Sequence, residues 1–248
     1  MEPERPITGS GLRTPRAAGV AGILFSVLLG VALVLIIVSQ PPDPAKPGAW
    51  LSDPARRDSL VVALNLVPFA GIAFLWFIGV VRDRIGQLED RFFATVFLGS
   101  GLLFVAMLFA GAAFAGGLAA EAAAGSAAAS TPSTLDIARR ITSLLLRLYA
   151  MRMAAVFTMS AATITLRTRV VPRWIGIAGI AVAVVLLVSV GLSLWVELLF
   201  PAWILLLSVD ILRTGLRRSA GAAATATDAA RSRRGYGDVL VPSPGQGT

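Results

Sequence analysis

The amino-acid sequence predicts an all-α membrane protein, a polytopic bundle of transmembrane helices. The chain of 248 residues is 56% hydrophobic and only 15% charged, whereas soluble domains are about 45–50% apolar and about 25% charged. Its mean hydropathy is +0.78. Apolar runs of about 20 residues recur, which is the length a helix needs to cross a hydrocarbon core of about 30 Å. Too few polar side chains remain to cover a water-soluble globule of this size.

The clearest element is a pair of apolar runs on either side of a short charged segment. Ser59–Val81 and Phe92–Phe114 are apolar, and Arg82–Arg91 between them reads RDRIGQLEDR. A linker this short and charged predicts an antiparallel helical hairpin whose connection lies in water. We place the second span at 59–81 and the third at 92–117.

The first span is expected at residues 17–38, after a polar N-terminal segment at 1–16. A cleaved signal peptide is the alternative, but its apolar region would be about 7–15 residues long, and Ser39-Gln40-Pro41-Pro42 is a poor cleavage site. We therefore expect a retained helix. A small residue at every fourth position predicts a ridge that another helix can approach closely. This ridge consists of Ala18, Gly22, Ser26 and Gly30.

The second and third spans contain residues that affect helix geometry and packing. Pro68 denies one backbone hydrogen bond and frees the carbonyl of Leu64, which predicts a kink. The amide of Asn65 is close enough to satisfy such a freed group. In the third span, glycines predict close packing against other helices, at Gly99, Gly101, Gly111, Gly116 and Gly117.

Residues 119–140 allow two interpretations, helix or loop. Ala119–Thr131 is an Ala/Gly/Ser stretch that is either a fraying helical extension or a loose loop. Ser133, with Asp136 three residues later, is typical of a helix start. A helix from there to about Arg167 exceeds the bilayer core, so its first turns should project into water or lie along the interface. We place the fourth span at 141–166.

The fifth and sixth spans are expected at 174–195 and 198–212. Pro172 suits the first position of a helix. Pro201 fits a first helical turn but not a helix interior, so we expect a break near Glu197. The alternative is five spans, with 174–212 as one tilted helix. Residues 213–248 are rich in small residues and arginine without apolar periodicity, which predicts a disordered basic tail.

The distribution of positive charge predicts that both termini are cytoplasmic. Six spans put both ends on one side, where most arginines near the spans then lie. The opposite side has only Lys46, Arg56, Arg57, Arg139 and Arg140, so the positive-inside rule gives the orientation. Five spans would put the basic tail outside, against this rule. The excess of Arg over Lys and the abundant Ala and Gly indicate a GC-rich bacterial genome, so the location expected for these spans is the bacterial cell membrane.

The residue types that are missing exclude several chemistries. The chain has no cysteine and no histidine, which removes thiol nucleophiles, disulfides and the usual general base and metal ligand. No glycine-rich nucleotide loop ending in Lys-Ser/Thr occurs. We therefore predict no enzymatic activity, no cofactor and no metal. The arginines of the tail are too sparse for a nucleic-acid partner, and attraction to anionic lipid is expected instead.

Polar and ionisable residues inside the spans are the candidates for a functional site. A polar site in the outer half of the bundle would combine Asn65, the carbonyl freed by Pro68, Arg152 and Glu197. Simpler alternatives stay open: Arg147 and Arg152 can snorkel to the interface, and Asp210 can pair with Arg213 three residues later. The full set of candidates is Asn65, Pro68, Arg147, Arg152, Glu197 and Asp210.

Residues Leu64–Phe104 read LNLVPFAGIAFLWFIGVVRDRIGQLEDRFFATVFLGSGLLF. This block resembles one found in uncharacterised multi-pass membrane proteins of actinobacteria. The resemblance covers the second and third helices and implies a cell-membrane location, without a particular activity.

These observations predict an integral membrane protein without enzymatic activity. It would be an accessory subunit of another membrane protein or a self-associating scaffold, with the lipid bilayer as its surroundings. Small-residue ridges on the first and third helices would supply the contact surfaces. The alternative is a small transporter or channel protomer with a polar site in the outer half of the bundle.

Overall fold

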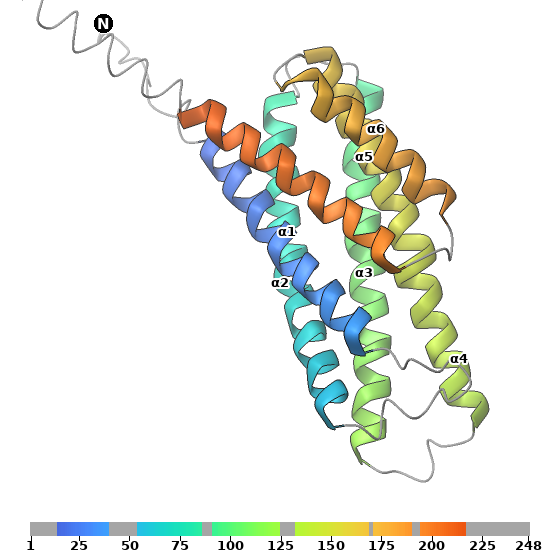
Figure 1. Cartoon of the computed structure of the whole chain (residues 1–248). Coiled ribbons are helices and arrows are strands. Elements are labelled where there is room, and N and C mark those ends of the chain that lie inside the picture. The colour runs from blue at the N-terminus through green and yellow to red at the C-terminus, as the bar shows by residue number, and fades with distance from the viewer. Residues whose placement is uncertain are drawn as a thin grey trace, which may run out of the picture.

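The structure is a computed structural model (Figure 1) that describes residues 14–39, 54–85, 91–124, 132–168, 171–189 and 194–216. Within these ranges the chain forms helices and contains no strand, so the all-α prediction is confirmed. The helices are α1 (Thr14–Ser39), α2 (Pro54–Ile85), α3 (Arg91–Ala124), α4 (Pro132–Ser143), η2 (Leu144–Ala150), α5 (Met151–Thr168), α6 (Arg173–Val188) and η3 (Leu194–Leu198). Residues 199–216 continue η3 as a further helix, called the last helix below.

Most of these helices have the length and composition of membrane spans. Five segments qualify, and they are Ala17–Ser39, Asp58–Arg82, Phe92–Ala120, Ile137–Thr168 and Trp195–Leu216. α6 is apolar but has only 16 residues, which gives a length of about 24 Å. The protein therefore has the helices of a membrane protein. The predicted number of crossings and the predicted cytoplasmic location of the termini stay predictions.

The helices pack in chain order, and the last helix returns to the first. α1 packs along α2, α2 along α3, α3 along α4, η2 and α5, and α5 along α6 (Figure 1). The last helix crosses α1 obliquely. A Cβ atom on Gly19 would lie 3.0 Å from the Cβ of Leu212, so the start of α1 lies beside the end of the last helix. We call this end of the bundle the near end, and the end with α4 the far end.

A cluster of phenylalanines fills the centre of the bundle. Its members come from α1, α2, α3, α5 and the last helix, and each is 0% exposed: Phe25, Phe74, Phe104, Phe157 and Phe200. Ring centroids are 4.4 Å apart for Phe25 and Phe74, and 5.0 Å apart for Phe104 and Phe200. Aromatic pairs at such distances add about 0.5–1.5 kcal/mol beyond area burial. This phenylalanine cluster ties the five helices together at one level.

Glycines allow close approach at some of the predicted positions and not at others. On α1, a Cβ at Gly22 would overlap Ser208 and lie 2.9 Å from Phe77, whereas Gly30 has no described atom within 4 Å. On α3, a Cβ at Gly101 or Gly111 would meet a side chain at 2.5 Å, but Gly99, Gly116 and Gly117 face open space. The predicted ridge on α3 is therefore only partly a contact within the molecule, because the other glycines lie on its outward surface.

The fourth predicted span is part of a long rod. α4, η2 and α5 follow without a gap from Pro132 to Thr168, and Figure 1 shows α4 reaching the far end. The predicted helix start near Ser133 is confirmed. α3 is helical to Ala124, so the first part of the Ala-rich stretch is helix, and residues 125–131 lie outside the described ranges.

The chain breaks between α6 and the last helix, earlier than predicted. α6 ends at Val188, where Ser189 (φ −79°, ψ 42°) leaves the helical conformation. Glu197, where a break was expected, lies inside η3. The alternative of one continuous helix over 174–212 is therefore wrong, while Pro201 does lie in the first turn of the last helix. The predicted N-terminal segment and basic tail lie mainly outside the described residues.

Candidate functional site

The candidate site is built around Arg147 in η2, a wider helical turn. η2 spans Leu144–Ala150 and is a π-helix. Such segments are rare and occur often at functional sites, because the extra residue per turn redirects side chains. Here the segment interrupts the rod between α4 and α5. Arg147 is the charged residue that it presents.

Arg147 pairs with Glu197 of η3. The Nε atom of Arg147 donates a hydrogen bond to Oε1 of Glu197 at 3.2 Å. The Glu197 side chain is 12% exposed and the Arg147 side chain is 35% exposed. The pair therefore links the rod to the start of the last helix, with a buried carboxylate and a half-open guanidinium.

The depth of this pair follows from the packing of α6 on α5. Gly176 faces Leu166 and Gly179 faces Ala162, and this antiparallel pairing brings Val188 level with about residue 153 of α5. Phe25 of the phenylalanine cluster lies about 12 Å from Ala17 and about 21 Å from Ser39, the two ends of its apolar segment. Val188 is thus only about 6 Å beyond Phe157 along the bundle axis.

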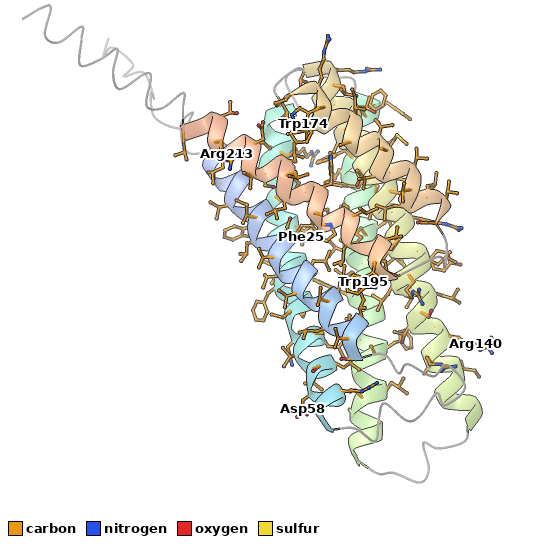
Figure 2. The ribbon with its side chains drawn as sticks, viewed as in Figure 1. Phe25, Asp58, Arg140, Trp174, Trp195 and Arg213 are labelled. Atoms are coloured by element: carbon orange, nitrogen blue, oxygen red, sulfur yellow. The ribbon has the colours of Figure 1, made fainter. Side chains whose placement is uncertain are left out.

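The end of α6 and the start of η3 therefore lie nearer the level of the phenylalanine cluster than the far end of the bundle (Figure 1). With the phenylalanine cluster at the middle of a hydrocarbon core whose half-thickness is about 15 Å, Val188 would lie about 9 Å below the far surface. Figure 2 agrees: Trp195 lies between the level of Phe25 and the level of Arg140 and Asp58. A pair of helices that stops at membrane depth is typical of substrate and ion sites in transporters. Glu197 lies at the tip of this pair.

Asn65 and Pro68 lie apart from this pair, on the exposed side of α2. The Nδ2 atom of Asn65 donates to the carbonyl of Val61 at 2.9 Å, and not to the carbonyl of Leu64 as predicted. The reason is the packing of α2, whose buried residues include Ala63, Val67 and Phe74. Position 65 falls between them and faces outward. A single shared site with Arg152 and Glu197 is therefore not formed.

Arg152 follows Arg147 by five residues and is half-buried. Among the residues that the structure describes, no hydrogen bond or ion pair of Arg152 is found. The structure thus assigns the partner Glu197 to Arg147, and the predicted combination of Arg152 with Glu197 is corrected. The π-helical turn and the oblique last helix determine which arginine reaches the carboxylate, and neither has a recognised sequence signature.

Asp210 lies on the last helix toward the near end. Its Oδ2 atom is buried and has no hydrogen-bond partner within the described residues. Arg213 is exposed, and the ion pair predicted between these two side chains is not seen in the described part of the chain. Ser208, which sequence reasoning missed, is 0% exposed, and its hydroxyl is also unpaired there. That hydroxyl occupies the space left by Gly22.

The described residues contain no group of three or more acidic, histidine or cysteine side chains that could hold a metal ion. The candidate site presents one arginine and one carboxylate, groups that can recognise charge. Comparison of the chain with protein-family models, with curated proteins and with solved structures finds no match.

Proposed function

We propose that the protein is a non-enzymatic helical membrane protein that acts by association within the bilayer, as an accessory or scaffold subunit. The observation that carries this proposal is the phenylalanine cluster, which fills the centre of the bundle with side chains from five helices. A centre packed in this way leaves the outward faces of the helices for contact with other molecules.

The outward face of α2 has the side chains suited to such contact. Phe69 is 62% exposed, Ile72 is 50% exposed and Trp76 is 71% exposed. Large aromatic side chains are enriched where proteins associate. Open space at Gly116 and Gly117 on α3 would also let a neighbouring helix approach closely. These faces support association, with a second copy or with another membrane protein.

A photo-crosslinking amino acid placed at position 76 tests the proposal in native membranes. We expect a product of defined mass that contains this chain and one further protein chain. The matched control is position 74, where Phe74 is fully buried, and it should react only within the chain. Capture of lipid alone at positions 69, 72 and 76 would contradict the association role.

We further propose that the location is the bacterial cell membrane with both termini in the cytoplasm. Arg82, Arg167 and Arg213 all lie toward the near end, where α2 and α5 and the last helix end. The positive-inside rule places such an end in the cytoplasm.

A small transporter or channel protomer is the second candidate. The specific observation in its favour is that carboxylates occur on both sides of the phenylalanine cluster, Glu197 toward the far end and Asp210 toward the near end. Intramembrane carboxylates commonly line ion or proton pathways. Purified protein in nanodiscs should then be stabilised thermally by a transported ion, and Asp210→Asn should remove that effect.

A further inference from the structure

We propose that Arg147 is the anion-binding group of a site that faces the far end, and that its ligand is an oxyanion such as phosphate or carboxylate. This proposal goes beyond the association role and does not depend on it. It depends on the unused donors of Arg147, on the depth of Glu197 and on the charge of the surrounding rod.

The hydrogen-bonding capacity of Arg147 is only partly used. A guanidinium has five N–H donors in a planar fork and cannot be deprotonated in a protein. Within the described residues Arg147 gives one of them, on Nε, to Glu197. The side chain is 35% exposed, so its terminal N–H groups are open to a ligand. Two parallel N–H groups match the two oxygens of a carboxylate or phosphate.

Glu197 acts as the positioning residue for this arginine. Its buried carboxylate accepts from Nε of Arg147, which restrains the plane of the guanidinium and leaves the terminal N–H groups outside this hydrogen bond. α6 ends and η3 begins at the level of α5, whereas α4 continues further toward the far end (Figure 1). An anion can therefore approach Arg147 from the far end without crossing the phenylalanine cluster.

The charge of the rod favours an anion at this position. Between residues 132 and 168 the sequence contains arginines at positions 139, 140, 147, 152 and 167 and one acidic residue, Asp136. Arg139 and Arg140 are exposed on α4, which extends from η2 toward the far end (Figure 1). Asp136 and Glu197 offset part of this charge, and the arginines of the rod outnumber these two carboxylates, an excess that favours oxyanions.

The oxyanion can come from two sources, a soluble anion or the head group of an anionic lipid. Purified protein is placed in nanodiscs of phosphatidylcholine and titrated with inorganic phosphate, and separately in nanodiscs that contain phosphatidylglycerol. The melting temperature is the readout, because a ligand that binds the folded state raises it. A rise with phosphate assigns the soluble source, and a rise only with phosphatidylglycerol assigns the lipid.

The variants are Arg147→Gln and, as the matched control, Arg152→Gln. The control removes the same charge five residues along the rod, at a side chain with no hydrogen bond among the described residues. We expect Arg147→Gln to weaken the response to the anion at least about tenfold, while Arg152→Gln changes it about twofold or less. Glu197→Gln keeps a side-chain oxygen that can accept from Nε of Arg147 but removes the negative charge that repels a bound anion, so it should strengthen anion binding.

Three results would overturn the proposal. These are no stabilisation of the wild type by either source, an unchanged response in Arg147→Gln, or equal losses in the two arginine variants. If Arg147→Gln does not fold, Glu197→Gln decides, and unchanged or weaker anion binding in that variant contradicts the proposal.

Discussion

At the scale of single residues, the bundle depends on places where a glycine makes room for a particular neighbour. Lipid tails are as apolar as the protein core, so packing and hydrogen bonds, and not the exclusion of water, hold membrane helices together. Gly22 accommodates Ser208 and Phe77 from two other helices, and Gly179 accommodates Trp203, whose Nε1 donates to the carbonyl of Ile175 at 3.0 Å.

Gly22→Ala and Gly30→Ala therefore should have opposite effects on stability. A Cβ at Gly22 would overlap Ser208, and overpacking of this kind destabilises by about 1–3 kcal/mol. Gly30 has no described atom within 4 Å, so alanine there should be neutral or stabilise by up to about 1 kcal/mol through helix propensity. Thermal unfolding in one detergent compares the two. Equal shifts would mean that α1 does not contact the last helix at Gly22.

The Arg147–Glu197 pair should behave as a coupled unit. Glu197→Leu leaves a guanidinium without its partner at membrane depth, and we expect the free energy of unfolding to fall by about 1–3 kcal/mol, somewhat less than for fully buried pairs because Arg147 is half-open. Arg147→Leu combined with Glu197→Leu should recover most of this loss. Arg152→Leu is the control and should leave stability unchanged or raise it.

A double-mutant cycle from chemical denaturation measures that coupling. Additive effects of the two substitutions would show that the contact at 3.2 Å contributes nothing to stability. A large loss in Arg152→Leu would instead support the pocket predicted from the sequence.

At the scale of the elements, the positions of the helices were predictable and their contacts were not. The length and composition of apolar runs mark spans whichever side faces the protein. In α1, Val27 is 50% exposed and Leu29 is 1% exposed. Both are apolar, because the lipid-facing and core-facing sides of the helix have the same composition, so residue type does not show which side packs inward. The phenylalanine cluster was missed for this reason. Only small residues such as Gly22 indicated a contact surface.

The antiparallel contact between α1 and the last helix can be tested by a disulfide. A Cβ at position 19 would lie 3.0 Å from the Cβ of Leu212, slightly closer than the about 3.5–4.5 Å of disulfides, so a small shift permits the bond. The chain has no native cysteine. Gly19→Cys with Leu212→Cys should form an intramolecular disulfide with a mild oxidant, detected by mass spectrometry. Gly30→Cys with Leu212→Cys should not, and bonding in both pairs would contradict the packing.

At the scale of the whole molecule, the pairing of the first and last helices places the start of the one beside the end of the other. Because α1 and the last helix lie antiparallel, their outer ends lie together at the near end. This holds whether α6 and the last helix cross the membrane or turn back inside it. The positive charge near this end then determines which side of the membrane it occupies.

Labelling of single cysteines in intact cells tests this orientation. Cysteine at position 87, which falls in the sequence between the near-end termini of α2 and α3, should react with a membrane-impermeant maleimide only after the cells are permeabilised. Cysteine at position 128, which falls in the sequence between the far-end termini of α3 and α4, is the control and should react in intact cells. Labelling of position 87 from outside would reverse the threading, since α2 ends at the same end of the bundle as the start of α1 (Figure 1).

Cysteine at position 188 tests how deep the end of α6 lies in the membrane. If α6 reaches the far surface, position 188 should be labelled as fast as position 128. If α6 ends about 9 Å below that surface, labelling should be far slower, because the thiol then lies in the hydrocarbon core.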